Sequence, residues 1–462
     1  MKTFISSLLV LALLGVPQLF AGQKSAPEQS PKLFKDGDRV CFIGDSITHG
    51  AFYIENLLLF YATRYPDARM QIYNAGMSGE GVGGVLKRLE WDVFNNKPDV
   101  SVIMIGMNDV PRGAYAEKWR NHESFPGRVK GFHERYSRDM DKVVKALTER
   151  TKKVVVFTPS IFDQTVQSKR ENLLGCNDAL GWAAEVDKAV AKKYGAEVVD
   201  IWSYMTEMNG RYQQSDPTRS FIDFDRVHPR DLGGFVMMAK VAIDMDESPF
   251  VSQIQIDAGS KSSAGTINAK VSDVKAAANG LSFTALENAL PFPMTAEKIE
   301  ADKVLNFTDT YNRQILKVSG LKTGDYDLKI DGRKVGRYSS AQLEKGVNLA
   351  SNKDTPQYRQ AEEVAKLCRK FKGQTQTCRA IVGAEIWLKI SHLKTVEERC
   401  RSLEQQLKEG KIKPGGDTAW AKAYPINKPR EAELLEGVQQ TIRQAYDAAK
   451  PVEHKFELVP AA

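Results

Sequence analysis

The chain has 462 residues, which is too long for one ordinary domain and predicts two or three. Apolar residues make up 42% and charged residues 27%, values that are ordinary for a soluble globular protein and exclude a chain that is disordered throughout. The formal net charge of +7 is spread thinly, with no dense Lys/Arg block interleaved with aromatic residues, so nucleic acid is not an expected partner.

The segment 1–21 is typical of a secretory signal peptide. Lys2 supplies a positive charge, residues 4–14 form a short apolar run, and Leu19-Phe20-Ala21 offers a cleavage site. The apolar run is too short to span a bilayer comfortably, and a short N-terminal anchor is the alternative. We therefore expect a secreted or periplasmic protein with no transmembrane segment in the mature chain.

Residues 22–248 alternate between predicted strands and predicted helices. Five short, almost continuously apolar runs are typical of strands buried on both faces of a parallel sheet. These strands lie at 39–44, 70–74, 99–105, 153–158 and 197–201, and helices are predicted at about 53–64, 85–94, 133–150, 179–194 and 232–245. The alternation predicts a doubly wound α/β fold, in which functional side chains gather beyond the carboxyl ends of the strands.

The sequence of the remaining residues predicts two further segments. Residues 249–350 form a predicted β-containing module, with a strand at 315–318 and a hairpin, 326–330 and 334–338, around the tight turn Asp331-Gly332. Residues 351–462 form a predicted helical region, with helices at 360–372, 379–408 and 431–448 and a terminal strand at 454–459. We expect a helical hairpin inserted into the β module, with the chain returning to the sheet at its end.

The five cysteines cannot all pair within the chain. Cys368 and Cys378 flank a predicted polar turn, which makes them the candidate pair for a disulfide. No CxxC pair or Cys/His cluster has the spacing of metal ligands, so no metal site is expected.

Four loops carry the candidate site residues. Ser46 closes a GDS tripeptide between the first strand and a helix, whose free N–H groups can face a negative charge. A glycine-rich loop with Gly79 follows the second strand, and Asn108 follows the third. Asp225 and His228 share a DRVHP loop before the last helix, a spacing that lets a carboxylate orient an imidazole. Taken singly, each residue also fits a turn or a helix cap.

The order and spacing of these residues resemble the motif pattern of the SGNH (GDSL) hydrolase family, over about residues 36–245. The resemblance implies a flavodoxin-like three-layer α/β/α domain with a five-stranded parallel sheet. It implies that Ser46 is the nucleophile, that His228 is the base, and that Asp225 orients it. It also implies an oxyanion hole made of the backbone N–H groups of Ser46 and Gly79 and the side-chain amide of Asn108. This chemistry needs no metal or organic cofactor, and the lack of a GxSxG motif argues against an α/β-hydrolase fold.

Other residues near these loops are weaker candidates. His49, Arg112 and Arg226 are candidate substrate-binding residues, although solvent-facing or structural roles are the alternative for each. Three tryptophans are expected in or near the core rather than as sugar platforms: Trp91, Trp182 and Trp202.

The predicted function is that of a secreted serine esterase acting on an acylated carbohydrate. The favoured substrates are O-acetyl esters on a polysaccharide or a sialylated host glycan. This expectation rests on a resemblance to exported family members that carry an appended module and remove acetyl groups from glycans. A lipase, lysophospholipase or thioesterase is the alternative among enzymes. A glycan-binding surface protein with a vestigial hydrolase domain is the alternative from another class.

Overall fold

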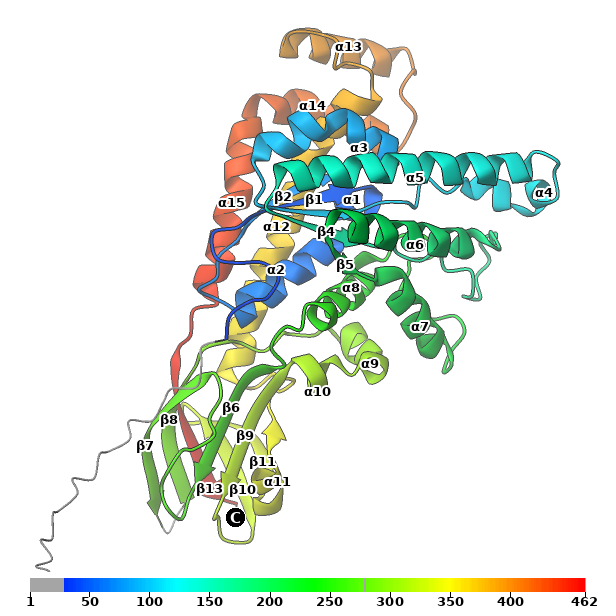
Figure 1. Cartoon of the computed structure of the whole chain (residues 1–462). Helices are drawn as coiled ribbons and strands as arrows, with labels where there is room; N and C mark the ends of the chain where they lie inside the picture. Colours follow the sequence, from blue (N-terminus) through cyan, green and yellow to red (C-terminus); the bar gives the residue numbers. More distant parts are fainter. Residues whose placement is uncertain (1–28, 278–279, 462) are drawn as a thin grey trace, which may run out of the picture.

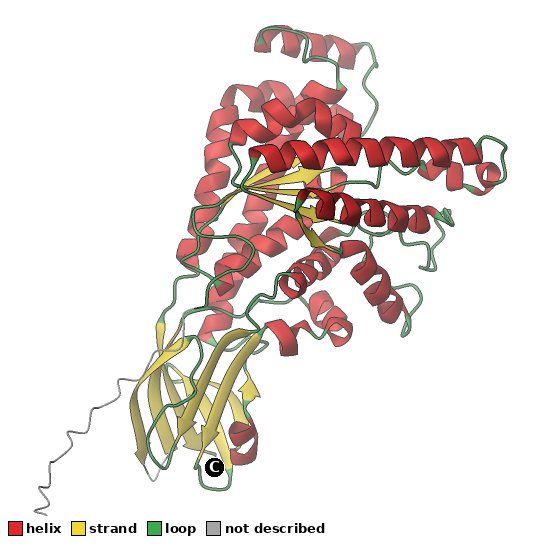
Figure 2. Ribbon diagram, viewed as in Figure 1, coloured by secondary structure: helices red, strands yellow, loops and turns green. Residues whose placement is uncertain are grey.

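The computed structural model of the protein describes residues 29–277 and 280–461, and the predicted signal peptide lies outside them. An α/β layer domain holds the first half of the chain, a β-rich module lies beside one end of it, and long helices from the C-terminal part run along the α/β domain (Figure 1). Figure 2 shows that the strands of the two sheet regions are well separated.

Five parallel strands form the sheet of the α/β domain, in the order β2-β1-β3-β4-β5. They are β1 (Arg39–Gly44), β2 (Gln71–Gly76), β3 (Val100–Met104), β4 (Lys153–Phe157) and β5 (Glu197–Val199). Every residue of β3 is buried, because helices cover both faces of the sheet. The strand order is that of flavodoxin-like sheets, and it confirms the predicted three-layer α/β/α fold.

Helices cover the sheet on its two faces. The helices of this domain are α1 (Ser46–Gly50), α2 (Phe52–Arg64), α3 (Val82–Arg88), α4 (Glu117–Arg120), α5 (Phe125–Arg150), α6 (Cys176–Tyr194), α7 (Ile201–Gln213) and α8 (Arg230–Asp244), of which the short α4 lies away from the sheet, near the start of α5 (Figure 1). Helix α7 was not expected, because Ile201 was assigned to the preceding strand. The Asp200 side chain accepts a hydrogen bond from the Ser203 N–H, which starts the helix there instead.

The β-rich module contains two sheets around a separate apolar core. The larger has the order β11-β10-β13-β8-β7, and the smaller has the order β12-β9-β6. The strands are β6 (Phe250–Asp257), β7 (Ala269–Ala277), β8 (Gly280–Glu287), β9 (Arg313–Ser319), β10 (Asp325–Ile330), β11 (Arg333–Ser339), β12 (Val347–Asn348) and β13 (Glu453–Pro460). Short helices α9 (Ala296–Leu305), α10 (Phe307–Tyr311) and α11 (Ser340–Lys345) lie within the same stretch of chain.

The C-terminal strand β13 pairs antiparallel with both β8 and β10, so it lies in the middle of the larger sheet. The helical segment follows β12 of the smaller sheet and precedes β13 of the larger sheet, so it is inserted into the β-rich module. It contains α12 (Pro356–Trp387), α13 (Val396–Lys408), α14 (Gly416–Asn427) and α15 (Glu431–Ala448). Helices α12 and α15 pack against each other and against α2. The buried apolar residues of α15 and of α12 up to Cys378 include members of the same core as the α/β sheet, while Ile381 and Ala384 of α12 belong to a separate cluster with α13 and α14.

Helix α12 runs through the position where the sequence predicted a polar turn. Gly373 lies inside the helix at a cost of about 1 kcal/mol relative to alanine, and the burial of Phe371 and Cys378 on either side outweighs it. Cys368 and Cys378 are therefore ten residues apart on one helix, about 15 Å along its axis. The suggested disulfide between them is wrong, and all five cysteines are free thiols.

Among residues 29–277 and 280–461, none of the helices combines the length and the apolar character that a bilayer crossing requires.

Candidate active site

A carboxylate, an imidazole and a hydroxyl form a hydrogen-bonded chain at the carboxyl edge of the sheet. Ser46 is the first residue of α1, directly after β1, and its Oγ lies 2.8 Å from Nε2 of His228. Nδ1 of His228 lies 2.5 Å from Oδ2 of Asp225. Folding thus brings together side chains that are 182 positions apart in the sequence. A hydroxyl held in this way can lose its proton to the imidazole and attack an acyl group.

Asp225 also shapes the loop that carries His228. Its Oδ1 accepts hydrogen bonds from the backbone N–H groups of Val227, at 2.9 Å, and His228, at 3.0 Å. Burial opposes ionisation of Asp225, but the hydrogen bonds from the His228 ring and from the two N–H groups hold its pKa well below the usual range. Asp225 is therefore a carboxylate, and it favours the His228 tautomer whose Nε2 can accept the Ser46 proton.

Asp45 caps the short helix that presents Ser46. Its Oδ1 accepts a hydrogen bond from the Ile47 N–H at 3.0 Å, and Ala51 ends the helix in the left-handed region, with φ of 59°. Burial raises the pKa of Asp45 to about 6. The cap fixes the first turn of α1, and with it the position of Ser46.

The loop after β2 contains Gly79, which has a positive φ of 82° that glycine adopts without strain. The Met77 N–H donates to the Gly44 carbonyl, which ties the start of this loop to the end of β1. His49, three residues after Ser46, lies against the same loop: its Nδ1 is 3.2 Å from Oγ of Ser78 and 3.4 Å from the Ser78 nitrogen. Gly79 is thus held next to the helix that presents Ser46.

Asn108 follows β3, and its side chain is oriented by two contacts. Its Nδ2 donates to the Glu80 carbonyl at 3.0 Å, and its Oδ1 accepts from Arg112 at 3.0 Å. An amide nitrogen carries two hydrogens, so a second one is left for a ligand. Arg112, a candidate for binding a substrate carboxylate, instead holds Asn108.

The two other candidate substrate-binding residues, His49 and Arg226, are buried. Burial, and then the nearby Arg379 and Arg88, lower the pKa of His49 to about 3, and its ring stacks on Trp420 with centroids 5.8 Å apart. Arg226 is 3% exposed, and its guanidinium donates to the backbone carbonyls of residues 163, 166 and 170. These three hydrogen bonds hold the Arg226 guanidinium against backbone carbonyls inside the protein.

A buried ionic network, which no sequence motif signals, connects the Gly79 loop to the C-terminal helices. Arg88 donates to Glu80 at 2.7 Å and to Asp92 at 2.6 Å. Arg379 of α12 makes two hydrogen bonds to Asp92, at 2.6 and 2.8 Å, and donates to the Gly76 carbonyl at 2.9 Å. Arg379 lies 303 positions from Gly76 and in no recognisable motif, so the sequence gives no signal of its role.

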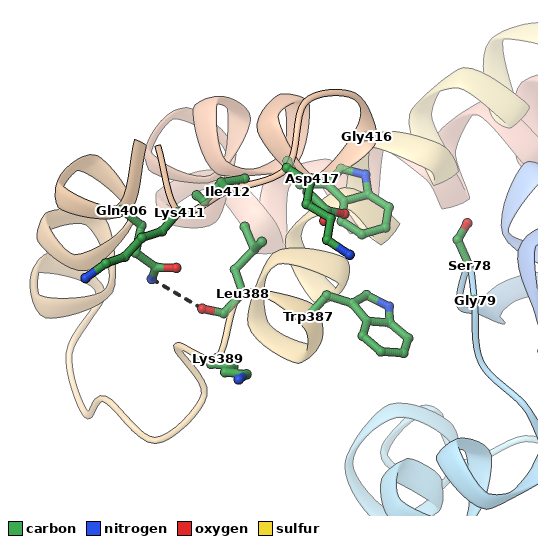
Figure 3. A pocket seen from close by; sticks show the side chains of 12 residues that line it. Ser78, Gly79, Trp387, Leu388, Lys389, Gln406, Lys411, Ile412, Gly416 and Asp417 are labelled. Carbon is green, nitrogen blue, oxygen red and sulfur yellow. Dashed lines mark hydrogen bonds between the residues drawn. The ribbon is translucent and has the colours of Figure 1, made fainter. Parts of the chain in front are cut away.

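Three hollows border these residues. A cavity of about 50 Å³ is lined by Ser46 and His228 together with Ile47, Gly50, Phe52, Tyr53, Pro229 and Arg230. A cleft of about 1030 Å³ separates the Ser78–Gly79 loop from α12, α13 and α14 (Figure 3). A second cleft of about 670 Å³ also borders Gly79 and runs between α3 and the end of α12. Trp387 lines both clefts.

Within the parts of the chain that the structure describes, no three His, Cys, Asp or Glu side chains are grouped so that they could hold a metal ion.

Residues 42–234 match the model of the GDSL-like lipase/acylhydrolase family. An acetylxylan esterase of Geobacillus stearothermophilus is 25% identical over 217 residues, which cover 44% of this chain and 90% of that protein. The solved structure of a gut microbial diltiazem-metabolizing enzyme is similar over 94% of this chain and 100% of its own, with 26% identity and a TM-score of 0.86. That similarity includes the β-rich module and the C-terminal helices. The α/β domain therefore belongs to the GDSL-like lipase/acylhydrolase (SGNH hydrolase) family, and the protein is an esterase.

Proposed function

We propose that the protein hydrolyses O-acetyl esters on carbohydrates, with Ser46 as nucleophile, His228 as general base and Asp225 as its orienting carboxylate. The hydrogen-bonded chain from Asp225 through His228 to Ser46 carries this proposal. The oxyanion is assigned to the backbone N–H groups of Ser46 and Gly79 and to the free Nδ2 hydrogen of Asn108.

The reaction has two half-reactions. Ser46 Oγ attacks the ester carbonyl carbon and gives its proton to Nε2 of His228, which forms a tetrahedral oxyanion. The intermediate collapses, the sugar hydroxyl leaves with the proton from His228, and an acyl-Ser46 ester remains. Water then attacks this ester, His228 takes a proton from it, and Ser46 Oγ leaves with that proton as acetate is released. Each oxyanion donor contributes roughly 3–4 kcal/mol to the stabilisation of the transition state.

Substitution of Ser46 tests the mechanism. Ser46→Ala should lower kcat on 4-nitrophenyl acetate by on the order of a thousandfold or more, because the nucleophile is absent. Circular dichroism and thermal unfolding check that the variant is folded. A folded Ser46→Ala variant that keeps near wild-type activity would overturn the assignment.

The small cavity at Ser46 supports a short acyl group. This hollow has a volume of about 50 Å³, against about 670 and 1030 Å³ for the two clefts, so it suits a short acyl group better than a long chain. Acetyl esters should therefore be cleaved with a kcat/KM at least tenfold above that of octanoyl esters. The opposite order would favour a lipase, a lysophospholipase or a thioesterase.

The similarity to an acetylxylan esterase supports a polysaccharide substrate. We therefore expect acetate release from acetylated xylan, and O-acetylated sialoglycans are the second polymer to test. The similarity of almost the whole chain to a diltiazem-metabolizing enzyme favours a second candidate, the ester of a small molecule. If wild-type protein cleaves small acetate esters but no acetylated glycan, the second candidate replaces the first. If it binds glycans and cleaves no ester, the protein is a binding protein with a vestigial hydrolase site.

We also propose that the protein acts outside the cytoplasm, on the support of the sequence at 1–21. N-terminal sequencing of the protein from its native cells should find a mature chain that begins after residue 21. Detection of an intact N-terminus in the cytoplasmic fraction would contradict export.

A further inference from the structure

Two tryptophans that flank Gly79 are unusually exposed. Trp91 follows α3 and Trp387 is the last residue of α12, and 43% of the surface of each is exposed. The sequence predicted Trp91 in the core or partly buried, and more than half of its surface is covered. In the part of the chain that the structure describes, neither indole stacks on another ring or on a cation. Exposed indoles that gather in a cleft are typical of a binding surface.

Trp387 lies beside Gly79, a residue of the proposed oxyanion hole. A Cβ atom built on Gly79 would be 3.6 Å from Cζ2 of Trp387, so the indole is in contact range of the proposed oxyanion loop. Figure 3 shows Trp387 facing Ser78 and Gly79 from across the larger cleft. Trp91 and Trp387 together line the smaller cleft. The two clefts therefore extend to either side of Gly79, with Trp387 common to both.

The end of α12 holds Trp387 in a fixed place. Glu385, two residues earlier, accepts hydrogen bonds from Arg399 of α13 at 2.7 Å and from Tyr424 of α14 at 2.8 Å. Lys428 lies 2.9 Å from the same oxygen. Leu388, the residue after Trp387, is buried, and its carbonyl accepts a hydrogen bond from the Gln406 side chain. An indole on such an anchored segment is a preorganised surface, which lowers the entropy lost when a ligand binds.

The surroundings of the two indoles suit a sugar. One face of a pyranose ring presents C–H groups, which pack on the negative face of an indole, while its rim of hydroxyls needs polar partners. The clefts supply such partners at their edges in Lys87, Lys389 and Ser391. Among the described residues, neither Lys87 nor Lys389 forms an ion pair, so both amines are free to donate. Because the two clefts extend to both sides of Gly79, together they fit a chain of sugars better than a single small ester.

We propose that Trp387, supported by Trp91, is an aromatic platform that stacks a sugar of the polysaccharide chain whose acetyl ester lies at Ser46. This inference rests on the proposed function of the Ser46 site and extends it. It assigns to the C-terminal helices the recognition of the polymer, while the α/β domain supplies the chemistry.

The test compares a polymer with a small ester for wild type, Trp387→Ala, Trp387→Phe and Trp91→Ala. Trp387→Ala should raise KM for acetylated xylan about tenfold with little change in kcat, since a remote contact made equally in ground and transition states affects KM. Its kcat/KM for 4-nitrophenyl acetate should stay within twofold of wild type. Trp387→Phe should restore most of the polymer activity, and Trp91→Ala should show a smaller loss than Trp387→Ala.

Leu435→Ala on α15 is the matched control, because this apolar side chain is 46% exposed and lies outside both clefts. It should behave as wild type on both substrates. Binding is measured separately by calorimetry with xylohexaose and Ser46→Ala protein, in which Trp387→Ala should weaken binding about tenfold. If wild type releases acetate from acetylated xylan and Trp387→Ala does so with unchanged KM, the platform is wrong while the proposed function stands. If wild type cleaves only the small ester, both proposals fall.

Discussion

At the scale of single residues, Arg112 decides how Asn108 faces the site. Its guanidinium holds Oδ1 of Asn108, which leaves the amide nitrogen toward the loop of Gly79. We expect Arg112→Ala to lower kcat on 4-nitrophenyl acetate about tenfold with little change in KM, because the amide then rotates and a donor is partly lost. Arg112→Lys should recover part of the rate. 4-Nitrophenyl acetate has no carboxylate that Arg112 could bind. A rise in KM with an unchanged kcat would therefore contradict the positioning role.

Asp109 makes the stability of the protein depend on pH. Burial raises its pKa to about 7 despite the hydrogen bond from the Val82 N–H, and Asp45 adds to the rise. The unfolded chain has the lower value, about 3.9, so the folded state binds the proton more tightly. The stability from this group is therefore fully present below about pH 4 and is lost as the pH rises through about 7. The Tm of wild type should fall over that range.

Asp109→Asn tests this dependence, since an amide oxygen can still accept from the Val82 N–H and carries no titrating group. Relative to wild type, the variant should unfold at a higher temperature by on the order of a few degrees at pH 8, and the gain should be clearly smaller at pH 5. Scanning calorimetry at the two pH values measures this. An equal shift at both would mean that the Asp109 charge is not the cause.

At the scale of elements, a buried ion pair between Arg379 and Asp92 links α12 to the α/β domain. Arg379 and Asp92 are 5% and 8% exposed, and they are joined by two hydrogen bonds. Arg379→Ala should lower the free energy of unfolding by about 3 kcal/mol, because a buried carboxylate loses one of its partners. Urea unfolding measures the change. The exposed pair of Arg443 and Glu436 on α15 is the control, and Arg443→Ala should cost less than 1 kcal/mol.

The elements that the sequence predicts well are those whose pattern reflects local burial. The five strands of the α/β sheet lie within two residues of their predicted bounds because both faces of each strand are covered, which makes their apolar runs continuous. Three of the four site loops could be placed for the same reason, since they follow those strands, and the loop of Asp225 and His228 was placed by its position before the last helix of the domain. Helix α12 could not be predicted as one continuous helix. Gly373 and its polar neighbours indicate a turn locally, and long-range packing maintains the helix. Arg379 and Trp387 were missed because their roles arise only when α12 meets loops about 300 residues earlier.

At the scale of the whole molecule, the esterase domain and the C-terminal helices share one core. Val364, Phe371 and Ile442 are each at most 1% exposed and belong to the same apolar cluster as Val102 of β3. The strand β13, which ends the helical insertion, completes the centre of the larger sheet in the β-rich module. Removing the C-terminal half therefore opens both the core of the α/β domain and a sheet edge.

We therefore expect a chain that ends at residue 248 to fail as an independent esterase, although it keeps Ser46, Asp225 and His228. It lacks α12 and α15, so the side of α2 that they cover becomes an exposed apolar surface. It also lacks Arg379, which leaves Asp92 without one of its two arginine partners. The truncated chain should be recovered mainly as aggregate, with no cooperative thermal transition and less than a hundredth of the wild-type activity on 4-nitrophenyl acetate. A soluble, cooperatively folding fragment with wild-type activity would show that the C-terminal helices serve only to bind the substrate.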